Sequence, residues 1–399
     1  MSAPCILLVG GGTGGHVFPM IAVADALQKM SPDVSLVFAG TSKGLEARVV
    51  PARGYTLELI EASALRGGGF KGALRGVGSL FVGVRQARAL LRKYQPNVVF
   101  SLGGYVAGGV SLAARLAGIP LALMEPNSIA GLANRMIAPF AQRAYVAFEE
   151  TEKYFSKKIC MRSGVALRTG FEPQPYVTPL GPVKVLILGG SQGARTLNHA
   201  LPVALAALTN SVQVLHQAGR GNAEQVAALY RQHCPELKVQ VLEFIDDMPQ
   251  ALIQSDLVVS RAGASAVSEI CAIGRPSVLI PFEFAADNHQ LHNALALQGC
   301  GAAVCIEGKD VTSESFAASL GQLIGNPEEL RKMAQAARNW GRPMAAQAVA
   351  RDLLQLAGLM RFGAVRPGEI DSPDENQDTQ SAARNDKAMP RSAQLLGAI

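Results

Sequence analysis

Short runs of consecutive apolar residues alternate along the chain with segments in which apolar residues recur every three or four positions. Such runs are typical of strands buried in parallel sheets, and the second spacing is typical of amphipathic helices. The strand-like runs are Cys5–Val9, Val34–Phe38, Val98–Phe100, Leu121–Met124, Val183–Leu188, Val212–Leu215, Val239–Leu242, Leu257–Ser260 and Val278–Ile280. Their alternation with helical segments predicts an α/β protein with parallel sheets covered by helices.

The helical pattern is clearest after the first strand-like run. Met20, Val23, Leu27 and Met30 form one apolar stripe. Because proline is tolerated in the first turn of a helix, we expect this helix to open at Pro19. A second stripe is formed by Leu197, Leu201, Leu205 and Leu208.

The same arrangement occurs twice along the chain. The glycine-rich loop GGTGGH (11–16) follows the run CILLV, and GGSQGA (189–194) follows VKVLIL. Between the two halves, residues 171–182 contain four prolines and show no periodicity, which is typical of a linker. The sequence therefore predicts two doubly wound domains that face each other across a cleft.

The composition agrees with a well-packed intracellular protein. Of the 399 residues, 49% are hydrophobic and 17% are charged, and the six cysteines form no CxxC pair. We therefore expect a reducing compartment and no metal site. No basic segment precedes the first apolar run, so a secretory signal is not expected.

The first glycine loop has a dinucleotide-like spacing but lacks the expected acid. Gly10, Gly12 and Gly15 satisfy G-x-G-x-x-G, yet the second strand ends in Gly40 and Thr41, and the nearest acid is Glu46. A nicotinamide-dependent dehydrogenase is thus disfavoured. The glycines instead favour close approach of backbone amides to a polar or anionic ligand, although a tight turn without a ligand would show the same residues.

Two residues are candidates for a general base. His16 follows the first loop at a helix N-terminus, where the dipole disfavours imidazolium and leaves a ring able to accept a proton. Glu125 follows a strand at the same edge of the predicted sheet and could act as base, orient His16 or bind sugar hydroxyls. The spacing does not decide between them, and His16 could also merely cap or fill the loop.

The second half contains a turn suited to a nucleoside diphosphate. After the strand 257–260, the amides of Gly263 to Ala266 could cradle a diphosphate at a helix N-terminus. Glu269, one turn later, could accept two hydrogen bonds from a ribose diol. An exposed helix residue without a ligand is the alternative for Glu269.

Seven motifs in this order resemble those of the MurG family, the bacterial lipid-linked N-acetylglucosaminyltransferases of peptidoglycan synthesis. They are GGTGGHVFP (11–19), GGYVAGG (103–109), EPNSIAGLANR (125–135), GGSQGA (189–194), EFIDDM (243–248), RAGASAVSE (261–269) and ADNHQLHNA (286–294). The resemblance covers residues 5 to 361. It implies a GT-B fold with two Rossmann-like domains, residues 1–165 and 166–342. A helix near 343–361 would pack back on the first domain. Residues 362–399 have no counterpart in the family; they are polar and almost free of large aliphatic residues, so their composition predicts a disordered tail.

The resemblance also implies the reaction, the transfer of N-acetylglucosamine from UDP-N-acetylglucosamine to the muramoyl 4-hydroxyl of lipid I, with inversion, to give lipid II. No cofactor would be required, and stimulation by a divalent cation is left open. His16 and Glu125 would be the catalytic candidates. Ile245 would meet the uracil and Glu269 the ribose. The other donor-binding residues implied are Thr13, Gly14, Gly15, Asn127, Arg168, Ser191, Ala264, Ser265, Ala266, Val267, Ser268 and Gln290.

One position departs from the family pattern. Where the family has an Asn-Pro turn after glycine, this chain has Val165 and Ala166. The substitution affects the segment that leads to Arg168, so the direction in which Arg168 points becomes a question for the structure.

A basic segment between residues 61 and 95 predicts contact with an anionic membrane. It contains seven basic residues and one acid, Glu61, with apolar residues on another helix face. The predicted membrane-binding residues are Lys71, Leu74, Arg75, Phe81, Arg85 and Arg88. We expect a peripheral protein on the cytoplasmic face of the inner membrane, possible association with a cell-wall synthesis complex, and no binding to nucleic acid, because aromatic residues do not interleave with the charges. A solvated helix face is the alternative for this segment.

Overall fold

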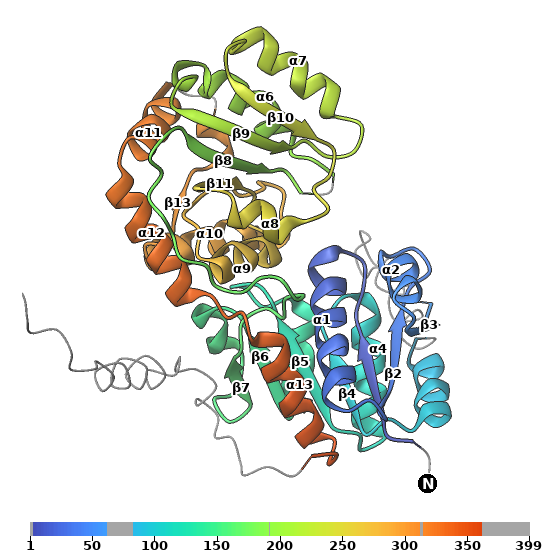
Figure 1. Cartoon of the computed structure of the whole chain (residues 1–399). Coiled ribbons are helices and arrows are strands. Elements are labelled where there is room, and N and C mark those ends of the chain that lie inside the picture. Colours follow the sequence, from blue (N-terminus) through green and yellow to red (C-terminus); the bar gives the residue numbers. More distant parts are fainter. Residues whose placement is uncertain (1–2, 62–82, 191, 312–313, 361–399) are drawn as a thin grey trace, which may run out of the picture.

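The computed structural model describes residues 3–61, 83–190, 192–311 and 314–360, which fold into two α/β lobes stacked one on the other (Figure 1). This arrangement confirms the predicted fold class. Six predicted features lie outside the described residues: Lys71, Leu74, Arg75, Phe81, Ser191 and the tail 362–399.

The first lobe contains a seven-stranded parallel sheet in the order β3-β2-β1-β4-β5-β6-β7. Its strands are β1 Cys5–Val9, β2 Ser35–Gly40, β3 Thr56–Leu59, β4 Val98–Ser101, β5 Leu121–Glu125, β6 Arg143–Val146 and β7 Cys160–Arg162. Its helices are α1 Gly14–Met30, α2 Glu46–Ala52, a helix over 83–94, α4 Tyr105–Leu116, α5 Leu132–Ile137 and the 3₁₀ helices η1 Ala138–Phe140 and η2 Glu149–Tyr154.

The second lobe contains a six-stranded parallel sheet in the order β10-β9-β8-β11-β12-β13. Its strands are β8 Val183–Leu188, β9 Val212–Gln217, β10 Lys238–Leu242, β11 Leu257–Ser260, β12 Ser277–Leu279 and β13 Ala303–Cys305. Its α-helices are α6 Arg195–Ala204, α7 Ala223–His233, α8 Met248–Ile253, α9 Ala264–Ile273, α10 His289–Gly299, α11 Glu314–Ile324 and α12 Pro327–Trp340, and its 3₁₀ helices are η3 Ala206–Leu208, η4 Ala286–Asn288 and η5 Gly308–Asp310. Residues 163–182, between the two sheets, contain no helix or strand.

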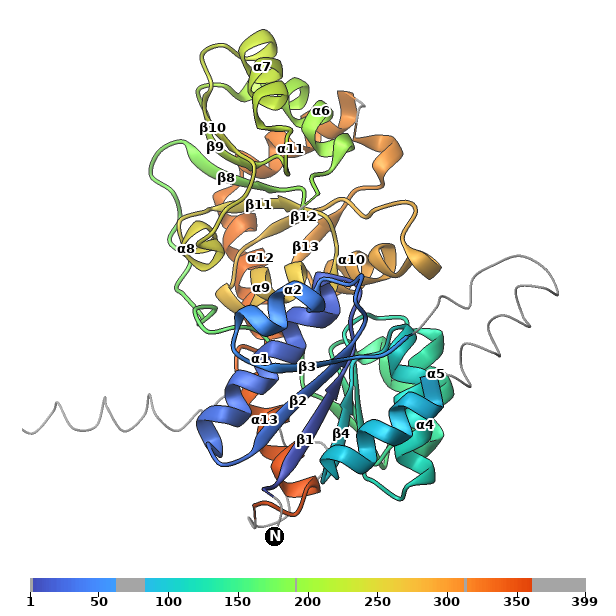
Figure 2. The same cartoon turned by 90° about the vertical axis from the view of Figure 1, so that its right-hand side faces the viewer.

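Both sheets reverse their strand order at one point, and this places the glycine loops. In the first sheet β1 pairs with both β2 and β4, and in the second sheet β8 pairs with both β9 and β11. Ligands of open α/β sheets bind beyond the carboxyl ends of the strands at such switch points. The loops after β1 and β4 therefore lie at the ligand-binding edge of one lobe, and those after β8 and β11 at that edge of the other (Figure 2).

The last helix, α13 Ala345–Leu356, returns to the first lobe and packs against α1 (Figure 1). Val349 and Leu353 are fully buried in the same apolar cluster as Ile21. Arg143 and Tyr145 of β6 both bind the Asp352 carboxylate, at 2.9 and 2.6 Å. The chain therefore crosses between the lobes twice, once through residues 163–182 and once before α13.

The start of α1 differs from the prediction. The helix begins at Gly14, inside the glycine loop, so Pro19 lies in its interior rather than in its first turn. A proline ring at this position meets the carbonyl of the residue four positions earlier, which is Gly15. Glycines have low helix propensity, and for this reason the pattern alone places the helix start too late.

Candidate active site

Two glycine loops of the first lobe lie against each other at the cleft. Gly12, Gly103 and Gly104 have φ values of 93°, 84° and 86°, which favour glycine over other residues. A Cβ on Gly104 would lie 3.4 Å from the Gly11 carbonyl oxygen. The loops after β1 and β4 therefore present backbone and open space to the cleft instead of side chains.

The buried carboxylate of Glu46 fixes the first glycine loop by hydrogen bonds. Its Oε2 accepts a hydrogen bond from the Gly12 amide at 2.8 Å, and its Oε1 accepts from the Thr41 amide and hydroxyl at 2.9 and 2.8 Å. A Cβ on Gly11, Gly40 or Gly44 would lie within 2.5 Å of the Glu46 side chain. These glycines therefore make room for Glu46, a role that spacing along the sequence does not reveal.

The environment of Glu46 favours its charged form. Burial by itself would raise the pKa of the Glu46 carboxyl. The hydrogen bonds from Thr41 and Gly12 outweigh burial and hold the pKa below its ordinary value. The sequence singles out Glu46 only as an acid in the wrong place for a dinucleotide, whereas the structure makes it an anchor between two loops.

His16, the third residue of α1, carries a free ring nitrogen. Its Nδ1 lies 3.3 Å from the Gly11 carbonyl oxygen. A carbonyl can only accept, so the neutral ring carries its proton on Nδ1 and its lone pair on Nε2. Within the described residues Nε2 has no hydrogen-bond partner. This is the arrangement that a general base needs.

Glu125, the other candidate base, is 3% exposed and engaged on both oxygens. Its Oε1 accepts from the Asn127 amide at 3.1 Å, and its Oε2 accepts from the Gly131 amide and Asn134 Nδ2 at 2.8 and 2.9 Å. These bonds tie the loop 125–131 to α5. The geometry favours His16 as the base and Glu125 as the residue that shapes this loop.

In the second lobe, α9 begins at the carboxyl end of β11 with Gly263 as its N-cap and no side-chain cap. The predicted diphosphate turn, residues 264–268, forms the first turn and a half of this helix. The hydroxyl oxygens of Ser265 and Ser268 are buried and have no hydrogen-bond partner in the described part of the chain. Unpaired buried hydroxyls are costly, so this turn is suited to an anionic ligand.

Arg168 and Glu269 meet at the boundary between the lobes. Arg168 Nη2 lies 3.9 Å from Glu269 Oε1, and its guanidinium lies 5.4 Å from the ring of Phe18 on α1. Burial raises the pKa of the Glu269 carboxyl to about 7, and Arg168 only partly opposes this. Val165 and Ala166, which replace the family's Asn-Pro turn, are buried, and Arg168 still reaches the α9 side of the cleft.

Several of the remaining predicted donor-binding residues form hydrogen bonds with other groups of the protein. The Ile245 amide donates to Gln217 Oε1 at 3.0 Å, and Gln290 Oε1 accepts from the Phe282 amide at 3.0 Å. Asn127 Oδ1 accepts from Asn293 Nδ2 of α10 at 3.2 Å, so this residue also joins the lobes. Thr13 is exposed at the N-cap of α1, next to Gly14 and Gly15 in its first turn.

No group of three or more His, Cys, Asp or Glu residues suited to a metal ion occurs among the described residues. The two predicted membrane residues that are described, Arg85 and Arg88, are exposed on the helix over 83–94. In the part of the chain that the structure covers, no helix is both long and apolar enough to cross a bilayer.

Helix α4, which shares a hollow with Arg88, and α5, which packs against α4, expose apolar side chains that the apolar pattern of the sequence does not single out. Leu116 of α4 is 59% exposed, and Leu132 and Met136 of α5 are each 62% exposed. The helix over 83–94, α4 and α5 share one apolar cluster beneath the sheet. Arg88, Arg92 and Leu116 line one surface hollow.

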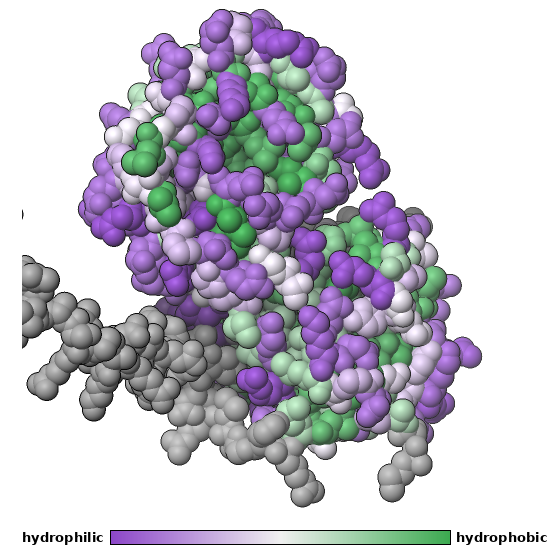
Figure 3. Space-filling model, in the orientation of Figure 1, coloured by the Kyte–Doolittle hydropathy of each residue, from purple (hydrophilic) through white to green (hydrophobic). Residues whose placement is uncertain are grey.

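The surface around the notch between the two lobes is mostly hydrophilic. Figure 3 shows this notch in the orientation of Figure 1.

Comparison with protein-family models matches both lobes. Residues 6–146 match the glycosyltransferase family 28 N-terminal domain, and residues 184–351 match the glycosyltransferase family 28 C-terminal domain. A Sorangium cellulosum protein is 45% identical over 366 residues, which make up 90% of each chain. It is named UDP-N-acetylglucosamine--N-acetylmuramyl-(pentapeptide) pyrophosphoryl-undecaprenol N-acetylglucosamine transferase. A protein of the same name from Acidithiobacillus ferrooxidans is 40% identical over 359 residues, 89% of this chain and 99% of that protein.

Solved structures show the same arrangement of lobes. The crystal structure of Acinetobacter baumannii MurG superposes with a TM-score of 0.76 at 32% identity and covers 88% of this chain and 99% of that one. The UDP-GlcNAc 2-epimerase from Neisseria meningitidis, bound to UDP-GlcNAc, gives a TM-score of 0.62 at 15% identity, with 88% and 100% covered. At that identity the second likeness concerns the fold alone.

Proposed function

This chain belongs to the MurG members of glycosyltransferase family 28, and we propose on that premise that it performs their reaction. It transfers N-acetylglucosamine from UDP-N-acetylglucosamine to the muramoyl 4-hydroxyl of lipid I, with inversion, and forms lipid II for peptidoglycan synthesis. The observation that carries this conclusion is 45% identity over 90% of the chain to a transferase named for the same donor and acceptor.

We propose that the second lobe binds the donor. The diphosphate would lie against the N-terminus of α9, where the first helical amides have no intrahelical acceptor and the hydroxyls of Ser265 and Ser268 have no partner among the described residues. Glu269 would accept hydrogen bonds from the ribose. Arg168, beside Glu269, would add a positive charge near the departing diphosphate. Gln290 and Asn127 would contact the sugar, and the backbone around Ile245 would meet the uracil.

The first lobe would then supply the base. Inversion requires the acceptor oxygen to attack the anomeric carbon from the side opposite the leaving diphosphate. His16 Nε2 would take the proton from the muramoyl hydroxyl, while the α9 N-terminus and Arg168 stabilise the developing charge. The glycines at 12, 103 and 104 would leave room for both sugars. Because protein groups can stabilise the leaving group, we propose that no bound metal is required.

We propose that the protein attaches peripherally to an anionic membrane through one face of its first lobe. Arg85 and Arg88 are exposed on the helix over 83–94, and Arg88 lines a hollow together with Leu116 of α4. Helix α5, which packs against α4, exposes Leu132 and Met136. A surface that combines cations with exposed apolar groups binds anionic lipid by both contributions. Attachment there would bring the cleft to a lipid-linked acceptor. Association with other cell-wall synthesis enzymes stays a prediction.

The reaction is tested by incubating the purified protein with labelled UDP-N-acetylglucosamine, with and without lipid I in detergent. We expect label to enter a lipid product only when lipid I is present. An epimerase would convert the donor without an acceptor, and a dehydrogenase would change nicotinamide absorbance. Either of those outcomes, or no conversion, would contradict the proposal.

A further inference from the structure

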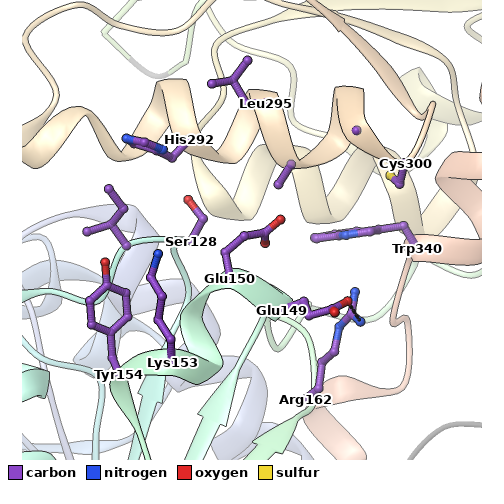
Figure 4. Close-up of a pocket in the computed structure, with 13 residues that line it drawn as sticks. Ser128, Glu149, Glu150, Lys153, Tyr154, Arg162, His292, Leu295, Cys300 and Trp340 are labelled. Carbon is purple, nitrogen blue, oxygen red and sulfur yellow. Dashed lines mark hydrogen bonds and ion pairs between the residues drawn. The ribbon is translucent and has the colours of Figure 1, made fainter.

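A groove of about 650 Å³ lies between the lobes, beneath α10. Its roof is the face of α10 from His292 to Cys300, and its floor is η2 with the loop after β5. Figure 4 shows His292, Lys153 and Tyr154 at one end, and Trp340, Arg162 and Glu149 at the other. Its volume is in the range of pockets that hold drug-sized ligands.

The groove contains charges of both signs that the protein leaves available. Arg162 and Glu149 pair with each other at 3.1 Å. Lys153 has an ammonium 5.2 Å from the Tyr154 ring but no ion pair within the described residues, and Glu150 likewise has no cation there. Free groups of opposite sign in one groove suit a ligand that itself carries carboxylate and ammonium groups.

Apolar surface separates these charges. Leu295 of α10 is 44% exposed along the groove, and Ile129 and Trp340 line it from the two lobes. Such alternation of apolar and charged groups suits a short peptide with both small and charged side chains.

Only a few residues separate the groove from the proposed sugar site. Ser128, which lines the groove, donates from its amide and hydroxyl to Asn293 Oδ1 at 2.9 and 2.8 Å. Asn293 Nδ2 in turn donates to Asn127 Oδ1, and Asn127 is a proposed sugar contact. Asn127 would contact the donor sugar, so an acceptor sugar that attacks this donor lies near Asn127 and Ser128, and a substituent on the acceptor sugar lies close to the groove.

We propose that this groove binds the peptide stem of the acceptor, an inference that rests on the proposed function. The stem is attached at the muramoyl 3-oxygen, next to the reacting 4-hydroxyl, so it leaves the acceptor sugar close to Asn127. Five extended residues span about 17 Å. The nine residues from His292 to Cys300, the last of which caps α10, span eight steps and rise about 12 Å, so a pentapeptide fills the groove with a short lead from the cleft. Lys153 would bind a peptide carboxylate and Glu150 a side-chain amine of the peptide, because the amino end of the stem is bonded to the muramoyl group.

The test combines a change in the protein with a change in the acceptor. The full-length protein and its Lys153→Ala variant are assayed with lipid I that carries the pentapeptide, and with a lipid-linked muramoyl acceptor that carries a single alanine. We expect Lys153→Ala to lower kcat/KM about tenfold for the pentapeptide acceptor, as for loss of a charged hydrogen bond, and to leave the short acceptor unaffected. The KM for UDP-N-acetylglucosamine should not change.

Two further variants define the result. Lys153→Arg, which keeps the cation, should recover most of the activity. Lys157→Ala, at an exposed lysine beyond η2 that does not line the groove, should behave as wild type with both acceptors. Equal losses with both acceptors, or no loss with either, would overturn the peptide site while the transfer reaction itself stands. Failure of the wild-type protein to use either acceptor would instead overturn the proposed function and this inference with it.

Discussion

His16 and Glu125 can be separated because their side chains have different surroundings. His16 has a free Nε2, whereas the Glu125 oxygens accept from Asn127, Gly131 and Asn134. We expect His16→Ala to lower kcat by about 10²- to 10⁴-fold, which is typical for a general base, with little change in UDP affinity.

Glu125→Gln should mainly lower the free energy of unfolding, by about 1–3 kcal/mol, because the amide replaces an acceptor of buried hydrogen bonds. Single-turnover rates, UDP titration and urea unfolding measure these effects, and an unchanged rate for His16→Ala would remove it from the mechanism.

Glu269 predicts a pH dependence of donor binding. Its pKa is raised to about 7 by burial, so the carboxylate that would accept from the ribose is mostly protonated at pH 6. We expect UDP to bind about tenfold more weakly at pH 6 than at pH 8, following the ionised fraction of Glu269. Glu269→Gln should remove this difference and retain only the titration of the nucleotide, as calorimetry at both pH values would reveal.

The pH dependence of stability due to Glu269 is opposite to that of donor binding: donor binding favours the charged carboxylate, and folding favours the neutral carboxyl. A carboxyl whose pKa is higher in the folded protein binds more protons when folded, so its contribution to stability falls as pH rises from the ordinary value of 4.5 to about 7. The charged form therefore costs at most about 3 kcal/mol at pH 8. Glu269→Gln should raise the melting temperature at pH 8 and leave it nearly unchanged at pH 4. A lower melting temperature at pH 8 would show that the charge is already compensated, for instance by Arg168.

At the scale of elements, Glu46 connects the loop after β1 to the loop after β2. Glu46→Ala leaves the Gly12 and Thr41 amides without their buried acceptor, which costs about 1–3 kcal/mol of unfolding free energy. Because the loop that carries Thr13 to His16 would lose its support, we expect kcat/KM for the acceptor to fall while UDP affinity in the other lobe stays the same. Glu58→Ala is the matched control, since Glu58 on β3 binds Lys93 and Tyr94 away from the glycine loops. Equal effects of the two substitutions would refute a positioning role for Glu46.

The sequence predicts elements well where one run of residues determines them. The apolar runs at β1 and β8 and the glycines after them appear where expected. The strands β6 and β7 contain Arg143 and Arg162 and are short, so they escape a search for apolar runs. Strand β3 is half-exposed with an alternating pattern over four residues, too short to distinguish from a loop.

Contacts between lobes are not predictable in this way. Ser128 and Asn293 lie 165 residues apart, and no local pattern pairs them. The same holds for Arg168 and Phe18, which meet only because two sheets face each other. The role of Glu46 is similarly hidden, since it depends on glycines at three separate positions. The sequence therefore indicates the chemistry of the two loops, and the fold determines which side chains share a site.

At the scale of the whole molecule, the proposed membrane attachment depends on one face of the first lobe. The helix over 83–94, α4 and α5 cover one side of the first sheet, and α1 and α13 cover the other. Among the residues that the structure describes, only the first of these layers combines exposed cations with exposed apolar side chains of the size of Leu116, Leu132 and Met136. The membrane and the second lobe would then contact different faces of the first lobe, so attachment leaves the cleft free to close on the donor.

Charge reversal on this face should weaken membrane attachment without changing the chemistry in the cleft. Each basic residue near an anionic bilayer contributes about 1 kcal/mol, so Arg85→Glu with Arg88→Glu should weaken sedimentation with anionic vesicles by at least about 30-fold. Binding should also decline as salt rises, because surface charges are screened. The matched control, Arg231→Glu with Lys238→Glu, makes the same change of charge on the second lobe and should bind vesicles as wild type does. Activity with a detergent-dispersed acceptor should survive in both variants, whereas activity on vesicle-borne acceptor should fall only for the first. Equal vesicle binding by the two variants would show that attachment uses another face.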